Sequence, residues 1–571
     1  MKPNIHNIEI EPETVFDRMG SGKVLPTWLV NIKEDFDYGL YSGFVLYGNV
    51  DDLYPMAGNL VRLDEFLVNY FKHDVAVILD PAIGIIPIRG FESVSGQFNI
   101  DPSADIPTRL HKFLLELYRL RKTVAPLIIL QGAKHWLGNR DNHLGLLVRR
   151  IVENSSHKDV RPTVIVLAER LGELSQDLVD SAYFKKADIQ YPSSAAIQEV
   201  LEEYSRRYYS CFEDIVGDLG VAADRLAGVG TLPLVNLIKR KAAKDEKLSM
   251  GELEAVKQRL VEETCGGLLE FINPTINLSA LHGQEHLKKV IRRDIAIWGE
   301  GKKSNISVPK GYLLIGPVGI GKTYFVEALA GEADVPVVKL NNFRSSTPGE
   351  TEANLEKIFR MLKSLSRCYV FIDEADQAMG SRQSGSDGSA GRVYSMFAQE
   401  IASESNRGKI IWIMATSQPH KLEPDLKRPG RMDLKIPLLP CETHVAGLAM
   451  IHEFGKRRNL ELEDPKMEDT NFALRETITR ENKYILGSVP EFLTPASAVV
   501  IVDEISRKKR EGGNVRDREL LMDALKEYQP MISPVIMREQ CRLAVRESSD
   551  LRFVPHEFQY LAEVDKPFIV L

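Results

Sequence analysis

A glycine-rich segment places the tightest limit on how this chain can fold. Residues 316–323 read Gly-Pro-Val-Gly-Ile-Gly-Lys-Thr and match the pattern G-x-x-x-x-G-K-[ST]. An apolar run at 312–315 precedes the segment, and a stretch with helical character begins at Tyr324. A strand, a tight turn and a helix in this order predict a loop whose backbone N–H groups converge on phosphate oxygens.

Each residue of the loop is a candidate for nucleotide binding. We expect Lys322 to neutralise the β- and γ-phosphates and the Thr323 hydroxyl to ligate Mg²⁺. The full candidate set is Gly316, Pro317, Val318, Gly319, Ile320, Gly321, Lys322, Thr323 and Tyr324. A glycine-rich turn that matches by chance is the alternative, and the flanking strand and helix disfavour it.

Two carboxylates end a second apolar run. Asp373 and Glu374 follow residues 370–372, about 50 residues after the phosphate loop. Asp373 is placed to coordinate Mg²⁺ through water, and Glu374 to orient and polarise an attacking water. An acidic pair at a strand end is also common as a solvated edge, and the preceding phosphate loop favours the functional interpretation.

A third segment contributes a hydroxyl and two arginines. The apolar run 410–414 is followed by Ala415, Thr416 and Ser417, where a hydroxyl could hold the attacking water. Arg428 and Arg431 lie in a Pro-Gly turn further along. They could be ordinary surface charges, or they could reach the γ-phosphate of a neighbouring subunit.

These three segments resemble the Walker A, Walker B and second-region-of-homology motifs of the AAA clade of AAA+ ATPases. That clade includes the proteasomal ATPases and the FtsH protease. The resemblance covers about 275–440 and, more weakly, a lid to about 510. It implies an ATP and Mg²⁺ site between subunits of a homo-oligomeric ring, usually a hexamer, with Arg428 and Arg431 acting in trans. It also implies adenine contacts near Leu281 and Gly283.

The chain departs from the family pattern at four places. Ser417 stands where the family usually has Asn, and Thr347 stands where its pore loop usually has an aromatic residue. Pro495-Ala496 replaces the usual Gly-Ala of the lid, and residues 494–500 contain no basic side chain that could act as a second sensor. The pore loop puts threading of substrates in doubt, and the other changes leave the rate of turnover open.

The first half of the chain has similar alternation without a phosphate loop. Short branched runs at 44–47, 75–79, 127–130 and 164–167 predict buried parallel strands. Gln131 and Gly132 follow the third run, where an active site would need carboxylates. This half resembles the inactive first domain of two-part bacterial and plastid AAA proteins, which implies a degenerate P-loop-like domain. An unrelated α/β domain that binds partners is the alternative. We interpret Asp51 and Asp52 as a solvated turn.

The predicted fold class is α/β, with a P-loop NTPase (AAA+) module and a helical lid preceded by a second α/β domain. The expected divisions are a flexible arm at 1–25, the degenerate domain at 26–194, a helical lid or connector at 195–274, the ATPase domain at 275–440, and a helical lid with its C-terminal extension at 441–571.

Composition limits the environment of the chain. The net charge is −7, which gives no global reason to expect nucleic acid as a partner. The five cysteines are widely spaced, which favours reduced thiols and a cytoplasmic location. No apolar run approaches the ~18 residues of a membrane span, so we expect no membrane partner.

Three hypotheses for function remain. The first is an ATP hydrolase whose ring remodels or disassembles a protein partner. The second is a nucleotide-gated scaffold or assembly factor with slow hydrolysis, which Ser417 and Thr347 favour. The third is a nucleic-acid-associated AAA+ motor, and the absence of a basic stripe or helix-turn-helix signature disfavours it.

Overall fold

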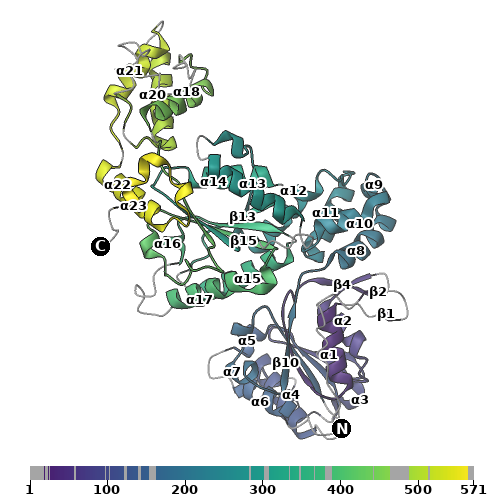
Figure 1. Cartoon of the computed structure of the whole chain (residues 1–571). Helices are drawn as coiled ribbons and strands as arrows, with labels where there is room; N and C mark the ends of the chain where they lie inside the picture. The colour runs from purple at the N-terminus through teal and green to yellow at the C-terminus, as the bar shows by residue number, and fades with distance from the viewer. Residues whose placement is uncertain are drawn as a thin grey trace, which may run out of the picture. The chain divides into compact units, whose positions relative to one another are not determined.

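The structure is a computed structural model of the chain. It describes residues 18–19, 23–24, 26–56, 59–96, 98, 100–101, 103–120, 125–138, 143–153, 162–281, 285–300, 308–333, 335–345, 349–365, 367–379, 389–441, 443–462, 488–490, 492–511, 515–530 and 532–563. The chain divides into two compact units, Met1–Cys265 and Gly266–Leu571 (Figure 1). Most of the arm expected at 1–25 lies outside the described residues.

A six-stranded sheet forms the centre of the first unit. Its order is β10-β3-β9-β8-β6-β7, and every neighbouring pair is parallel except β6 with β7. The four strands predicted from branched runs are confirmed as β3, β6, β8 and β9. The strands are β3 (Gly43–Gly48), β6 (Ala76–Asp80), β7 (Gly84–Arg89), β8 (Leu127–Leu130), β9 (Thr163–Ala168) and β10 (Phe184–Ile189).

Helices cover both faces of this sheet (Figure 1). Because successive side chains of a strand point to opposite faces, each strand contributes to two cores. Phe44 and Ile129 pack with helices α1 and α2, whereas Val45 and Ile128 pack with α4 and α6. The helices are α1 (Thr27–Asp37), α2 (Leu63–Phe71), α3 (Glu92–Ser95), α4 (Ile106–Leu120), α5 (Ala133–Trp136), α6 (His143–Glu153) and α7 (Gln176–Val179).

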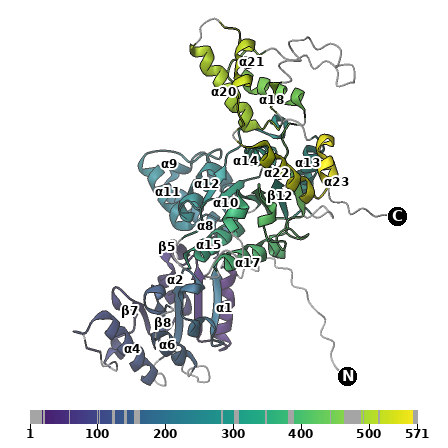
Figure 2. The same ribbon diagram turned by 90° about the vertical axis from the view of Figure 1, so that its left-hand side faces the viewer.

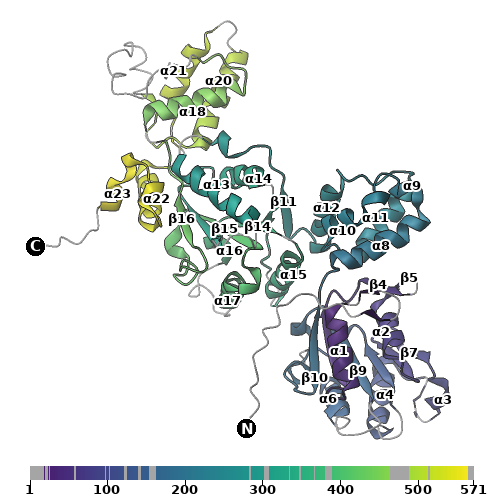
Figure 3. The same ribbon diagram turned by 45° about the vertical axis from the view of Figure 1, so that its right-hand side comes forward.

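A hairpin and a helical bundle complete the first unit. Strands β4 (Leu53–Met56) and β5 (Asn59–Arg62) form an antiparallel pair directly after β3. The bundle follows β10 (Figures 2 and 3). Its helices are α8 (Ser194–Arg207), α9 (Tyr209–Phe212), α10 (Leu219–Leu226), α11 (Thr231–Ala243) and α12 (Leu253–Cys265).

The second unit has its own six-stranded sheet, in the order β11-β13-β14-β15-β12-β16. Only β11, which pairs with β13, is antiparallel to its neighbour. The range 195–274, expected to form a connector, includes β11. The strands are β11 (Leu269–Ile272), β12 (Gly311–Ile315), β13 (Val337–Leu340), β14 (Cys368–Ile372), β15 (Ile410–Thr416) and β16 (Leu434–Pro437).

The two sheets have the same topology. If the parallel strands of each unit are numbered along the chain, both sheets read 5-1-4-3-2. Each sheet also carries one antiparallel strand beside its second parallel strand, β7 in the first unit and β11 in the second. The P-loop-like fold predicted for the first half is therefore confirmed at the level of strand order.

Helices also cover both faces of the second sheet (Figure 1). Helices α13 (Glu285–Glu300) and α14 (Lys322–Ala333) share a core with Tyr312 and Phe371. On the other face, Phe359 of α15 (Glu350–Ser364) and Phe397 of α17 (Ser389–Ala402) pack edge-on against Trp412. The short helix α16 (Ala375–Met379) follows β14.

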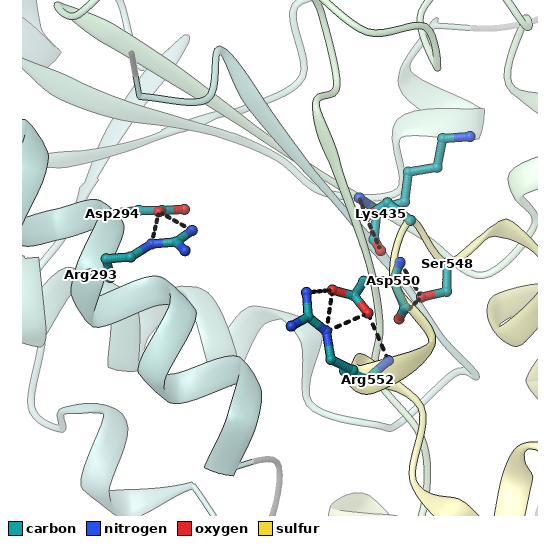
Figure 4. A network of polar contacts seen from close by, with 7 residues as sticks. Arg293, Asp294, Lys435, Ser548, Asp550 and Arg552 are labelled. Carbon is teal, nitrogen blue, oxygen red and sulfur yellow. Dashed lines mark hydrogen bonds and ion pairs between the residues drawn. The ribbon is translucent and has the colours of Figure 1, made fainter. Parts of the chain in front are cut away.

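The C-terminal region is helical in its described residues. Helices α18 (His444–Lys456), α20 (Pro495–Glu511) and α21 (Asp517–Glu527) share one core. Helix α22 (Pro534–Glu547), which precedes α23 (Tyr560–Glu563), returns to β16. Figure 4 shows Asp550 paired with Arg552 beside Lys435 of β16, whose carbonyl accepts a hydrogen bond from Ser549 N at 3.1 Å. Among the described residues, no helix is both long and apolar enough to cross a bilayer.

Candidate active site

The glycines of the phosphate loop hold a backbone shape that other residues would disturb. Gly319 and Gly321 have φ values of 79° and 86°, in the left-handed region that favours glycine. A Cβ on Gly316 would lie 2.2 Å from the Leu438 carbonyl oxygen, so only glycine fits where the loop passes the end of β16. The loop leads directly from the buried strand β12 into the N-terminus of α14, as the sequence predicts.

Lys322 points back into the loop. Its Nζ donates to the carbonyl oxygens of Gly316 at 2.9 Å and Pro317 at 3.0 Å. Burial lowers the pKa of Lys322, because a buried ammonium loses hydration, and the carboxylates of Asp373, Asp376 and Glu374 oppose this shift. A half-buried cation whose hydrogen bonds go to two loop carbonyls is suited to receive an anionic group.

Thr323, at the start of α14, is in contact with Asp373, which directly follows β14. The Thr323 hydroxyl donates to Asp373 Oδ2 at 3.0 Å, and the other carboxylate oxygen, Oδ1, accepts from Glu374 N at 2.9 Å. Glu374 has a φ of 45°, which is strained for a residue with a side chain. The structure therefore brings together the two expected metal ligands and the expected base at the end of one strand.

The end of β15 resolves which hydroxyl can face a water. Thr416 is fully buried, and its hydroxyl donates to Asp376 Oδ1 at 2.6 Å while accepting from Gln418 N at 2.9 Å. Its only proton is therefore committed to the protein. Both Thr416 and Ser417 line the cavity described next. Ser417 is therefore the better candidate for a contact with the attacking water.

A cavity of about 820 Å³ lies over the loop. Its wall includes Leu281, the loop from Val318 to Tyr324, Asp373, Glu374 and Ser417. Gly316 and Pro317 are not among its lining residues. Gly283 and the pore-loop residue Thr347 lie outside the described residues.

Residues of the lid line the same cavity, and all of them except Pro495 and Ala496 lie outside any sequence motif. Ala496, at the start of α20, donates its N–H to the Gly319 carbonyl at 3.3 Å. Arg457, at the end of α18, donates to the Tyr324 hydroxyl at 3.4 Å. The lid residues that line the cavity are Ala446, Met450, Phe454, Arg457, Arg458, Pro495, Ala496, Val499 and Val502. Basic side chains thus reach the site from α18, although residues 494–500 contain none.

The C-terminal helix α22 also touches the phosphate loop. Val318 N donates to the Gln540 side-chain carbonyl at 3.3 Å. The partners are 222 positions apart in the sequence, so no local pattern could have indicated this contact. It connects the loop directly to the segment that returns to β16.

The two candidate arginines lie apart from the cavity lining. Arg428 and Arg431 belong to the turn that precedes β16, and both form ion pairs with Asp425. Neither lines the cavity of its own chain. That position is compatible with the expectation that they act on a neighbouring subunit.

The first unit lacks the acidic pair at the end of β8, the strand that corresponds to β14. Gln131 and Gly132 follow β8 as Asp373 and Glu374 follow β14. The Gln131 side chain donates to the Asp64 carboxylate, and Trp136 Nε1 donates to the Gln131 carbonyl at 2.8 Å. No carboxylate stands at either position, as the sequence predicts.

Asp52 occupies the segment where a phosphate loop would follow β3. Its Oδ2 accepts from Thr231 N at 2.9 Å and Asn49 Nδ2 at 2.8 Å. Its Oδ1 accepts from Leu232 N at 2.7 Å and Leu53 N at 2.9 Å. Thr231 is the first residue of α11, so the carboxylate satisfies N–H groups at a helix N-terminus.

The interpretation of Asp52 as part of a solvated turn is therefore wrong. Asp52 is only 4% exposed, and its four hydrogen-bond donors compensate for the loss of water. Asp51 lines a neighbouring cavity of about 530 Å³, and its pKa is raised by partial burial and by Glu169. Six carboxylates and two cationic side chains line this cavity, a balance that disfavours phosphate groups. The charged lining residues are Asp51, Asp52, Asp64, Asp80, Glu169, Glu173, Arg62 and Lys134.

None of the five cysteines, all of which the structure describes, forms a disulfide. Cys211, Cys265, Cys368 and Cys541 are buried, whereas Cys441 is half-buried and lines the cavity over the phosphate loop.

ATP with Mg²⁺ fits the residues of the second unit. The cavity has the size of a small-molecule site, and glycines with positive φ let the backbone approach a phosphate closely. The described residues contain no cluster of three His, Cys, Asp or Glu side chains that could hold a metal. Mg²⁺ needs no such cluster, because it usually binds through one or two protein oxygens plus waters and substrate phosphates. Thr323 and Asp373 would supply those oxygens.

Comparisons with known families match one segment in each half of the chain. Residues 312–439 match the family described as "ATPase family associated with various cellular activities (AAA)". Residues 17–190 match the family described as "AAA+ chaperone, N-terminal Rossmann-like domain".

Three relatives illustrate the range of similarity. The "Uncharacterized AAA domain-containing protein ycf46" of Guillardia theta is 26% identical over 333 residues, or 57% of this chain and 62% of the relative. The "ATP-dependent zinc metalloprotease FtsH" of Thermobaculum terrenum is 29% identical over 259 residues, which cover 44% of this chain and 36% of the relative. The "Cell division cycle protein 48 homolog" of Archaeoglobus fulgidus is 24% identical over 493 residues, which cover 78% of this chain and 64% of the relative. The chain therefore matches less than two thirds of the length of each.

Proposed function

We propose that this chain, which carries an AAA ATPase domain in residues 312–439 and a Rossmann-like domain of the AAA+ chaperone type in residues 17–190, hydrolyses ATP in a ring of identical subunits. The energy of hydrolysis would change the conformation of a protein partner or disassemble a complex. The observation that carries the proposal is the meeting of Lys322, Thr323, Asp373 and Glu374 at one cavity.

Each residue of the site would have a separate role in hydrolysis. The loop N–H groups and the N-terminus of α14 bind the phosphates, and Lys322 exchanges its carbonyl partners for phosphate oxygens. Thr323 and Asp373 would hold Mg²⁺, which neutralises charge on the phosphates when bound. Glu374 orients and polarises the attacking water, and Ser417 contacts that water from the neighbouring strand.

A ring supplies what one subunit lacks. The described residues that line the cavity include Arg457 and Arg458 of the lid but neither Arg428 nor Arg431. A neighbouring subunit would bring the turn that carries these arginines to the γ-phosphate, where positive charge stabilises the charge that develops in the transition state. ATP would therefore bind within one subunit and be hydrolysed at an interface.

A nucleotide-gated scaffold with slow hydrolysis is the second candidate. Ser417 favours it, because its side chain is shorter than the Asn that the resemblance implies and holds a water less directly. In a scaffold, ATP binding would drive assembly and hydrolysis would only reset it. The two candidates share the nucleotide site and differ in turnover.

The test measures ATPase rate and particle mass, with and without ATP, for the wild type and three variants. We expect the wild type to hydrolyse ATP, Lys322→Ala to lose nucleotide binding, and Glu374→Gln to form a stable ATP-dependent ring. Arg431→Ala should lose turnover while each subunit still binds ATP. A wild type that stays monomeric with ATP, together with an Arg431→Ala variant of unchanged rate, would exclude the ring. Assembly with full biological function in Glu374→Gln would favour the scaffold.

A further inference from the structure

One carboxylate holds both candidate arginines in the turn before β16. Asp425 Oδ1 pairs with Arg428 Nη2, and Asp425 Oδ2 pairs with Arg431 Nη1. The same Arg431 nitrogen donates to the Asp425 backbone carbonyl at 2.9 Å. Two guanidinium groups thus share one acidic residue, which leaves the group with a net positive charge.

The two arginines differ in exposure. The Arg431 side chain is 17% exposed, whereas that of Arg428 is 62% exposed. Arg431 also retains its bond to a backbone carbonyl, which no side-chain substitution at position 425 removes. Arg431 is therefore fixed to the turn, and Arg428 is the side chain that can extend toward another molecule.

The turn itself is attached firmly to the sheet. The Asp433 carboxylate accepts from Gly430 N and from Lys310 N, each at 2.6 Å, and Lys310 directly precedes β12. A Cβ on Gly311 would lie 2.7 Å from the Arg431 carbonyl oxygen, so strand and turn are in close contact. The end of the turn cannot shift without disturbing the strand that leads into the phosphate loop.

We propose that Asp425 is a positioning residue for hydrolysis in trans: it holds Arg428 in an extended, ready geometry, with Arg431 as the fixed base of the turn. This inference rests on the proposed ring mechanism. An exposed ion pair is weak, whereas a guanidinium on a phosphate at a closed interface makes strong charge-assisted hydrogen bonds. Arg428 therefore exchanges Asp425 for the γ-phosphate of the neighbouring subunit at little cost. Asp425 itself contacts no nucleotide.

The first test separates rate from binding. In Asp425→Ala we expect kcat for ATP to fall about tenfold, because Arg428 is no longer held near its working position. KM and the affinity for ATP should stay unchanged, because the altered residue serves the neighbour's site. Asp425→Glu should recover part of the rate. Glu404→Ala is the matched control, since Glu404 also bridges two cations, Lys310 and Arg407, and its loss should leave kcat unchanged.

The second test uses mixed rings. Asp425→Ala retains Glu374, and Glu374→Gln retains the complete arginine turn. An interface is complete where the nucleotide site of an Asp425→Ala subunit faces the arginine turn of a Glu374→Gln subunit. Random mixing gives this arrangement at about one interface in four. We expect mixing to raise the rate above that of either variant alone. A mixture of Asp425→Ala with Arg428→Ala, both defective in the turn, should show no gain.

The outcomes separate this inference from the ring mechanism. If Arg428→Ala loses turnover but Asp425→Ala keeps the wild-type kcat, Asp425 has no positioning role and the ring mechanism stands. The inference also fails if Asp425→Ala weakens ATP binding, or if mixing with Glu374→Gln gives no gain. If the wild type neither assembles nor hydrolyses ATP, the proposed function itself is wrong.

Discussion

Gly132 and Glu374 occupy the same position in the two sheets, and both have left-handed backbone conformations. Each is the second residue after the third parallel strand of its unit, and their φ values are 56° and 45°. Glycine adopts this conformation freely, whereas a residue with a side chain is strained in it. In the first unit this left-handed conformation is adopted by a glycine, without strain and without a carboxylate. In the second unit it is adopted by a glutamate, which has both the strain and the carboxylate.

Glu374→Gly should therefore stabilise the second unit while abolishing hydrolysis. Relief of the left-handed strain should raise the free energy of unfolding by about 1 kcal/mol. Thermal unfolding of the full chain, followed by calorimetry, measures this gain beside the ATPase rate. Glu374→Ala is the control, because it removes the carboxylate but keeps a Cβ. A Glu374→Gly variant less stable than Glu374→Ala, by the entropy that glycine adds to the unfolded chain, would show that the conformation costs nothing.

Asp52→Ala should destabilise the first unit. The change removes an acceptor of four hydrogen bonds and leaves the buried Thr231 N–H group without its partner. We expect a loss of about 3 kcal/mol. Hydrogen exchange of the amides at the start of α11 and urea unfolding of the full chain both report it. Asp51→Ala serves as the adjacent carboxylate control, and an equal effect from it would contradict the role of Asp52.

Lys322→Met should stabilise the nucleotide-free protein. The pKa of Lys322 is lowered by burial, so the folded state disfavours the ammonium, and that penalty is fully present below the lowered pKa. The penalty disappears as pH rises through the usual lysine range. The stability difference between Lys322→Met and wild type should therefore be largest near neutral pH and shrink in alkali. Saturating ATP should reverse the order near neutral pH, because only the wild type binds it. Denaturant unfolding across pH measures both effects.

The hydroxyls of Thr416 and Ser417 should affect hydrolysis in different ways. Ser417→Asn extends the side chain toward the water position and should raise kcat about threefold, whereas Ser417→Ala should lower it. Thr416→Val removes the 2.6 Å bond to Asp376 and should cost about 1 kcal/mol of stability as well as rate. Steady-state ATPase assays beside thermal unfolding distinguish the two. A Ser417→Asn variant slower than wild type would contradict the assigned contact.

Local sequence patterns predicted the strands that are uniformly apolar. Runs such as 127–130 and 410–414 need no tertiary information, because burial on both faces demands branched residues throughout. Strand β10 was not predicted, since Lys185 and Lys186 interrupt its apolar pattern at the edge of the sheet. Strands β11 and β16 were also not predicted, because they are short, lie at the edges of the second sheet and contain polar residues.

In the candidate site, too, only the features visible in local sequence were predicted. Residues 316–323 and the pair at 373–374 are contiguous, so their spacing alone indicated phosphate chemistry. Apart from Pro495 and Ala496, the lid residues could not be found, and neither could Gln540, because they reach the loop from more than one hundred positions away. Asp52 was misjudged because its partner Thr231 lies 179 positions along the chain. Its charge was visible in the sequence, and the helix N-terminus that neutralises it was not.

Cys441 gives the chain a natural labelling handle. It is the one half-buried thiol among five, and it lines the nucleotide cavity while the other four are buried. A maleimide fluorophore should therefore attach there first without any engineered residue. Bound ATP would shield the thiol, so the rate of labelling becomes a readout of nucleotide occupancy, and the same position could accept a covalent inhibitor.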